Sequence, residues 1–354
     1  MFDKKSLDFL EKFVNTPSPS GFERPAQEVW RAYVSEFADK VESDIQGNAV
    51  GIINKAGRPR VMLIGHCDEV GFMVRYINDQ GFIYFGSIGG VDPNIVPAKR
   101  VIINTAKGAV KGVVGRTAIH LQEKEDEKKA PKMHELWIDI GAKSKDEALE
   151  RVSIGDPAVF DTGFEILSGD FAVARGFDDK MGAFVVAEAL KILSEEKGCK
   201  AAVYGVSSVQ EEISFAGAAT SAFSIDPAVA IAVDVGNATD TPGISKEKHG
   251  EIKLGLGPII DRGSSVSPRV EETLKKVALE RKIPFQIGAA PRYTGTDADA
   301  VFKSRAGVAC GLLSVPNRYM HTPVEVIHLG DLEQCAKLMA AFVGQLDESA
   351  DFRR

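Results

Sequence analysis

The chain has 354 residues, of which 44% are hydrophobic and 26% charged, and its formal net charge is −7. This length exceeds what one compact core usually holds, so we expect two domains, or one domain with a large insertion. The acidic balance argues against a nucleic-acid-binding protein with a broad basic face. No apolar run is long enough to cross a bilayer, and the N-terminal residues lack the apolar core of a signal peptide. Four widely spaced cysteines show no pairing pattern, so we expect reduced thiols and a cytoplasmic protein.

The N-terminal part of the chain predicts the beginning of an α/β domain. Apolar residues at helical spacing predict helices over 3–15 and 23–40. A strand, a turn and a second strand are expected over 41–53. The apolar run 61–66 then predicts a buried strand that ends at His66.

From about residue 72 to residue 163 the pattern changes to short β-rich segments separated by glycine turns, which is typical of a small barrel or sandwich. Within it, the charge run 122–129 predicts an exposed loop. From residue 170 onward helices and strands alternate again, which is typical of a layered α/β core. We therefore predict an α/β domain formed by residues 1–70 and 166–354, interrupted by a β-rich domain of residues 71–165.

Polar side chains follow several predicted strands or precede a predicted helix. They are His66 and Asp68, Asp178 and Asp179, Glu211 and Glu212, Asp234, and His321. In open α/β sheets, sites form just beyond the carboxyl ends of the strands. We therefore expect these residues to be neighbours in space, although they are far apart in the sequence.

The chemical types of these residues suit divalent metal ions. Imidazole and carboxylate ligands together fit zinc, cobalt or manganese. One catalytic zinc ion keeps about three protein ligands, so the full set suits two ions that share one carboxylate. Two such ions can polarise a carbonyl group and activate water, and a remaining carboxylate can accept a proton.

Each residue also has a structural explanation when it is considered alone. His66 could be a hydrogen-bonded structural histidine, and Asp234 could be a turn residue. Asp178 and Asp179 could stabilise the first turn of a helix. We prefer the metal interpretation because five separate strand-end or loop sites repeat one chemical theme.

Five motifs in order resemble the M42 family of metallo-aminopeptidases, which includes the glutamyl, deblocking and TET aminopeptidases. The motifs are GHCDEVGF (65–72), GFDDKMG (176–182), VQEEISFAGA (209–218), AVDVG (232–236) and RYMHTPVE (318–325). The resemblance implies a zinc-peptidase (phosphorylase/hydrolase-like) α/β/α domain with an inserted β-barrel-like dimerisation domain. It also implies a homo-oligomer, either a dimer formed through the inserted domain or a tetrahedral dodecamer.

The resemblance implies roles for seven residues. Two divalent ions, Zn²⁺ or Co²⁺ with Mn²⁺ as an alternative, would be held by His66, Asp178, Glu212, Asp234 and His321. Asp178 would bridge both ions, and the peptide bond after it would be cis. Glu211 would be the general base. Asp68 would hold the outer nitrogen of His66 and fix its tautomer.

The expected activity is the release of N-terminal residues from short peptides, with neither nucleic acid nor membrane as a partner. A related deacylase or dipeptidase with the same metal pair remains an alternative. An endoglucanase is a less suitable reading, because glycosidases need two opposed carboxylates and usually no transition metal. A metal-dependent assembly protein without activity is the non-enzymatic alternative. Residues 295–298, Arg318 and Tyr319 are candidates to shape the substrate pocket, and the preferred N-terminal residue is not predicted.

Overall fold

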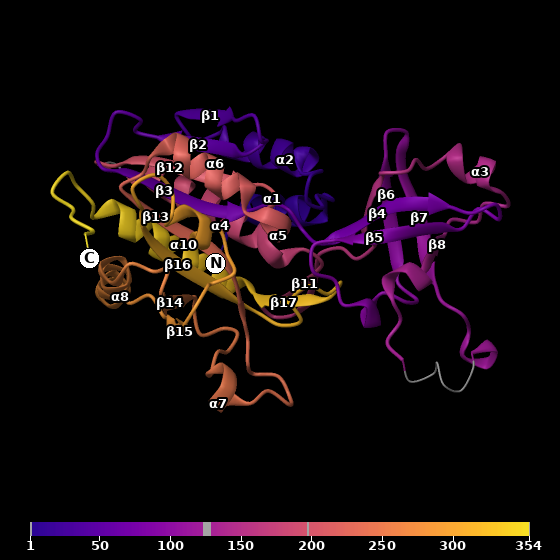
Figure 1. Cartoon of the computed structure of the whole chain (residues 1–354). Coiled ribbons are helices and arrows are strands. Elements are labelled where there is room, and N and C mark those ends of the chain that lie inside the picture. The colour runs from indigo at the N-terminus through magenta and orange to yellow at the C-terminus, as the bar shows by residue number, and fades with distance from the viewer. Residues whose placement is uncertain (1, 123–128, 197, 354) are drawn as a thin grey trace.

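The computed structural model describes residues 2–122, 129–196 and 198–353. An α/β body and a separate barrel lie side by side in Figure 1, with the barrel on the right. The α/β fold with an inserted barrel that the sequence predicts is thus confirmed. Most of the charge run 122–129, expected as an exposed loop, lies outside the described residues.

The α/β body is built on an eight-stranded mixed sheet. Its strands are, in spatial order, β1 (Lys40–Ser43), β2 (Ala49–Ile53), β12 (Ala202–Ser208), β3 (Arg60–His66), β13 (Val229–Asn237), β16 (Ala309–Asn317), β14 (Ile259–Gly263) and β15 (Gln286–Ala290). The four central strands, β12, β3, β13 and β16, run parallel to one another. Their carboxyl ends therefore meet at one edge of the sheet.

Helices cover both faces of this sheet. One face packs against α1 (Lys4–Asn15), α2 (Arg24–Val34), α4 (Phe177–Glu195), α8 (Pro268–Arg281) and α10 (Leu329–Gly344). The other face packs against α6 (Ala216–Ile225) and α9 (Ala298–Val301). Strand β3 serves both layers, since Val61 and Leu63 belong to the first cluster and Met62 and Ile64 to the second. A continuous apolar run is what a strand buried on both sides requires.

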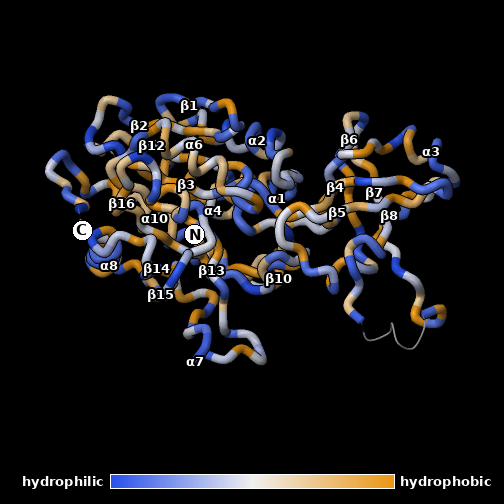
Figure 2. The backbone as a smooth tube through the Cα atoms, viewed as in Figure 1, coloured by the Kyte–Doolittle hydropathy of each residue, from blue (hydrophilic) through white to orange (hydrophobic). Residues whose placement is uncertain are grey.

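The inserted domain is a closed barrel with its own hydrophobic core. Its strands are, in spatial order, β4 (Gly71–Ile77), β5 (Ile83–Ile88), β8 (Trp137–Asp139), β7 (Gly108–Gly115), β6 (Arg100–Thr105) and β9 (Pro157–Phe160), and it carries α3 (Lys145–Leu149). Inside the barrel, the ring of Phe72 packs edge to face against the rings of Phe85 and Phe160, with centroid distances of 5.0 and 5.1 Å. Figure 2 shows hydrophobic segments along the barrel strands as well as through the α/β body. The barrel core is therefore separate from the hydrophobic clusters of the body.

Some elements differ from the sequence prediction. A small sheet of β10 (Glu165–Ser168), β11 (Phe171–Ala174) and β17 (Glu325–His328) is not predicted, because its strands are short and β10 is exposed throughout. After β12 the chain forms two helices, α5 (Glu211–Ser214) and α6, which are separated at Phe215 by a left-handed backbone with φ of 54°. The excursion after β13 carries α7 (Lys246–His249). Within the described parts of the chain, no helix combines the length and apolar character needed to span a bilayer.

Candidate metal centre

The sequence-predicted site residues come together at the carboxyl edge of the main sheet. His66 is the last residue of β3, and Asp234 lies near the end of β13. Asp178 is in the first turn of α4, and Glu211 and Glu212 begin α5 shortly after β12 ends. His321 lies in the loop between β16 and β17. Figure 1 shows α5 and β17 on the side of the α/β body that faces the barrel.

Asp178 is shared between two groups of three potential ligands. His66, Asp178 and Asp234 form one group and Asp178, Glu212 and His321 the other, and in each group the ligand atoms lie within 4.8 Å of one another. Oδ1 of Asp178 lies 3.4 Å from Nε2 of His66, whereas Oδ2 lies 3.2 Å from Nε2 of His321. The two oxygens thus face different histidines, as a bridging carboxylate requires.

The residues present fit a pair of divalent cations. His66 Nε2 and Glu212 Oε1 are buried and have no hydrogen-bond partner among the described residues. Leaving buried polar atoms unsatisfied costs roughly 1–3 kcal/mol each. Because both atoms belong to the ligand groups, coordination of a cation would satisfy them. Imidazole and carboxylate donors in threes match the ligand set of a catalytic zinc-like site.

The electrostatics of the cluster also call for positive charge. Burial raises the pKa of Glu211 to about 10, with the Asp234 carboxylate adding to the shift. Burial and neighbouring carboxylates raise the pKa values of Glu212 and Asp234 well above the usual range. Burial alone would lower the pKa of His66, but the carboxylates of Glu211 and Asp178 raise it well above its usual value. The chain therefore packs more carboxylates here than its own cations can balance.

Glu211 belongs to neither ligand group. Its Oε2 lies 3.6 Å from Nε2 of His66, and its side chain is 8% exposed. Gly217 allows this turn to pack tightly, because a Cβ there would lie 2.4 Å from the Val209 carbonyl oxygen. Glu211 is therefore placed beside the ligands, where the positive charge of bound cations would lower its raised pKa and favour the carboxylate form.

Asp68 connects His66 to the two glutamates. Nδ1 of His66 lies 3.1 Å from the carbonyl oxygen of Asp68 and 3.4 Å from its carboxylate. The carboxylate accepts the backbone N–H groups of Glu211 and Glu212 at 3.0 and 3.2 Å, and the hydroxyl of Ser20 at 2.6 Å. The expected support of His66 thus includes the backbone of Asp68. No sequence pattern indicates that Ser20 contacts Asp68.

Asp179 has no ligand position but supports the same segment. The Asp178–Asp179 peptide bond is cis, as expected. The Asp179 carboxylate accepts the backbone N–H groups of His66 at 3.1 Å and of Gly182 at 3.0 Å. A side chain at position 182 would collide with this carboxylate, since a Cβ would lie 2.2 Å from its Oδ2. Position 182 therefore requires glycine.

A buried ion cluster that sequence reasoning missed lies behind the ligands. Lys180 Nζ lies 2.6 Å from Oε1 of Glu69, and Arg175 Nε lies 3.2 Å from its Oε2. Lys180 also donates to the carbonyl oxygens of Val14 and Thr16. The cluster joins the segments around Asp68 and Asp178 to the loop after α1. The sequence indicates this ion cluster only in that Glu69 lies within the motif GHCDEVGF and Lys180 within the motif GFDDKMG.

The candidate substrate-pocket residues are placed differently from one another. Asp297 is buried and accepts the hydroxyl hydrogen of Ser208 at 2.5 Å, next to the end of β12. Arg318 forms a bidentate ion pair with Asp240, with distances of 2.8 and 2.6 Å. Tyr319 is half exposed. Of the three, Arg318 is thus already engaged by a carboxylate.

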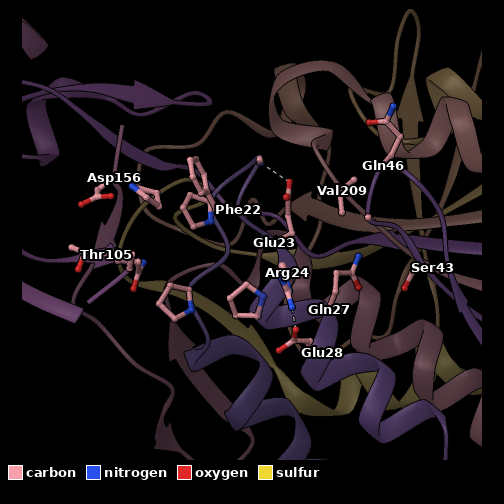
Figure 3. Close-up of a pocket in the computed structure, with 18 of the residues that line it drawn as sticks. Phe22, Glu23, Arg24, Gln27, Glu28, Ser43, Gln46, Thr105, Asp156 and Val209 are labelled. Carbon is pink, nitrogen blue, oxygen red and sulfur yellow. Dashed lines mark hydrogen bonds and ion pairs between the residues drawn. The ribbon is translucent and has the colours of Figure 1, made fainter. Parts of the chain in front are cut away.

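A cavity of about 880 Å³ lies between the loop before α2, α2 itself and the barrel. Figure 3 shows Thr105 and Asp156 of the barrel on one side and Ser43 and Gln46 on the other. Its described lining includes none of the seven predicted site residues. Glu23, which lines the cavity, connects it to the site, because its carboxylate accepts the backbone N–H of Gln210 at 3.2 Å and Gln210 precedes Glu211.

Comparisons with known proteins agree with this geometry. The family model of M42 glutamyl aminopeptidases matches residues 47–338. The lysyl aminopeptidase of Pyrococcus furiosus is 34% identical over 344 residues, which cover 96% of this chain and 97% of that protein. A TET aminopeptidase from the marine sediment archaeon Thaumarchaeota archaeon SCGC AB-539-E09 superposes with a TM-score of 0.93 at 33% identity, covering 97% of each chain. The TET1 peptidase of Pyrococcus horikoshii, described as assembling into a tetrahedron or a large octahedral shell, gives 0.85 at 33% identity and covers 96% of this chain and 100% of that one. The chain therefore belongs to the M42 glutamyl aminopeptidase family and is an aminopeptidase.

Proposed function

We propose that this aminopeptidase uses two divalent metal ions to release N-terminal residues from short peptides. The observation that carries the proposal is the position of Asp178, whose two oxygens face the histidines of two separate ligand groups. Glu211 beside them belongs to neither group and supplies the base. This arrangement suits hydrolysis by activated water.

The ligand roles follow from the two groups. His66 and Asp234 would hold one ion, Glu212 and His321 would hold the other, and Asp178 would contact both. When bound, the ions would polarise the scissile carbonyl group and lower the pKa of water. Zinc and cobalt suit these donors best, and manganese is also compatible.

Glu211 performs the proton transfers in this mechanism. It accepts a proton from the attacking water and delivers it to the leaving amine. Asp68 keeps Glu211 in place through its backbone N–H. No covalent acyl intermediate is needed. The nearby thiol of Cys67 is buried, and burial raises its pKa well above the usual value, so it stays protonated.

Assembly and location are further parts of the proposal. The P. horikoshii relative is described as assembling into a tetrahedron or a large octahedral shell, and a second TET1 structure is described as a dodecamer. Both support a homo-oligomer and, more finely, a dodecamer. The barrel exposes Tyr76, Val113 and Ile154, and these side chains are suited to a dimer contact. We place the protein in the cytoplasm, where its four cysteines would remain reduced. Light scattering would measure the assembled mass.

The decisive experiment is an assay of the chelator-treated protein after reconstitution with Zn²⁺, Co²⁺ or Mn²⁺. Aminoacyl anilides with a free amino group should be cleaved only after metal is restored, whereas their N-acetylated counterparts should remain intact. Cleavage of N-acyl amino acids in preference to anilides would favour the deacylase. Chelator-resistant hydrolysis of a β-glucan would favour an endoglucanase. Full aminopeptidase activity in thoroughly metal-free protein would refute the proposal.

A further inference from the structure

Glu325 is a buried carboxylate at the end of the RYMHTPVE motif, and the mechanism above gives it no role. It is 1% exposed and belongs to neither ligand group. Its Oε2 accepts the backbone N–H of Asp178 at 3.0 Å, and its Oε1 accepts the backbone N–H of His321 at 2.8 Å. One side chain thus contacts the backbone of two members of the group formed by Asp178, Glu212 and His321.

The small sheet explains how Glu325 reaches both segments. Strand β17 pairs antiparallel with β11, with Glu325 opposite Ala174, and the chain runs from there to Asp178 within four residues. On its other edge, Val326 forms an isolated bridge with Arg318, three residues before His321. Glu325 therefore lies on a strand between the two ligand-bearing segments.

The backbone of His321 needs such support. Its φ is 60°, a left-handed conformation that is costly for a residue with a side chain, and such residues persist only where the surroundings hold them. Its N–H is held by Glu325, and its Nδ1 lies 2.7 Å from the carbonyl oxygen of Gly90. Glu325 thus fixes the backbone while Gly90 orients the ring.

We propose that Glu325 is a positioning residue for the second metal subsite, formed by Asp178, Glu212 and His321. This inference rests on the proposed two-metal function and goes beyond it. Both oxygens of the Glu325 carboxylate must accept a hydrogen bond, because each faces a backbone N–H group. A glutamine has one acceptor oxygen and an NH₂ group, so one of the two contacts would become donor against donor. The Glu325→Gln variant therefore disturbs the backbone of Asp178 or His321 without touching a ligand side chain.

The test is the metal content of the whole protein at controlled free Zn²⁺. Wild-type protein should bind two ions per chain. In Glu325→Gln, the ion of the second subsite should bind about 10–100-fold more weakly, as is typical when a partner behind a ligand is lost. The first subsite, which has His66 and Asp234, should be affected much less. The binding isotherm should therefore separate into one strong and one weakened step.

Asp331→Asn is a matched control. Asp331 is equally buried, and its carboxylate accepts two backbone N–H groups, those of Gly255 and Gly257 at 2.7 and 2.8 Å. The variant loses the same kind of contact in a different segment, so it should still bind two ions with wild-type affinities. Equal weakening in both variants would overturn the inference, because it would indicate a general effect on folding.

A second variant and a metal-free readout cover the case in which Glu325→Gln does not fold. Glu325→Asp keeps the charge and both oxygens but is one methylene shorter, so it cannot reach both N–H groups. In metal-free protein, amide hydrogen exchange of segments 175–180 and 318–324 should be faster in this variant, and exchange around Gly255 should be unchanged.

The outcomes for the inference and for the proposed function are distinguishable. Unchanged exchange in Glu325→Asp, or two wild-type binding steps in Glu325→Gln, would overturn the role of Glu325 and leave the two-metal function intact. A wild-type protein that binds fewer than two ions would overturn the proposed function and the inference together.

Discussion

Replacing Glu211 with glutamine tests the proposed base with little structural disturbance. The amide has nearly the size of the carboxylate, and the backbone N–H that Asp68 accepts at 3.0 Å is unaffected. Glu211 belongs to neither ligand group, so both ions should remain bound. The change removes the group that accepts the proton from water, and it removes little else.

The expected loss of turnover can be estimated, because the substitution changes the general base and leaves the ligand groups intact. A positioned general base contributes about 10²–10⁴-fold to the rate. At about 1.4 kcal/mol for each tenfold step, the loss corresponds to a barrier roughly 3–6 kcal/mol higher. The loss should fall on kcat, because substrate contacts with the ligands and pocket are retained.

The assay is steady-state hydrolysis of a free-amine anilide, with the metal content of each sample measured in parallel. Glu271→Gln is a suitable control, because Glu271 is also a buried glutamate but lies in α8 and pairs with Lys275. Its kcat should match the wild type. Near-normal kcat in Glu211→Gln with two ions bound would show that another group accepts the proton, and the mechanism would be wrong.

Two further predictions concern stability. Lys180→Met leaves the buried carboxylate of Glu69 short of one cation and should lower the free energy of unfolding by about 3–5 kcal/mol, measured by urea denaturation. Lys4→Met, which removes the exposed ion pair with Asp8, should leave the free energy of unfolding nearly unchanged. Equal losses of stability in the two variants would contradict the reasoning. Burial raises the pKa of Glu188 above its usual value of 4.5, although Tyr33 donates a hydrogen bond to it. A carboxylate with a raised pKa in the folded state stabilises the fold fully below pH 4.5, and this contribution is lost as the pH rises through the pKa of the folded state. The amide of Glu188→Gln does not titrate. The free energy of unfolding of this variant, relative to that of the wild type, should therefore be higher at pH 8 than at pH 4. A gain that is the same at both pH values would refute this assignment.

The strand-end residues were the part of the site most accessible from the sequence. A run such as 61–66, apolar until it ends at His66, marks both a buried strand and the point where it leaves the core. Asp234 follows the same pattern in β13. His321 has no such signal, because it lies in an irregular loop with a left-handed backbone. The prediction grouped it with the strand-end residues, and the family resemblance then assigned it a metal ion. The structure places it beside Asp178.

The supporting residues could not be predicted in the same way. Glu325, Asp179 and Ser20 act through hydrogen bonds to backbone groups or to another side chain far away in the sequence. Hydropathy patterns report which side chains are buried, but they do not report which N–H group a carboxylate meets. The small sheet that carries Glu325 was missed for a related reason, since four-residue strands give too short a pattern to recognise.

The hydrogen bonds around the centre have a common character that bears on metal binding. Asp68, Asp179 and Glu325 are buried carboxylates that hold ligand segments by accepting neutral backbone N–H groups. The lysine and arginine of the ion cluster are instead engaged by Glu69, behind the ligands. A lysine or arginine among the ligands would compete with a metal ion for the same carboxylates, whereas an N–H group positions the backbone without adding a full positive charge. The chain therefore fixes the ligand geometry and still leaves the negative charge of the centre available for cations.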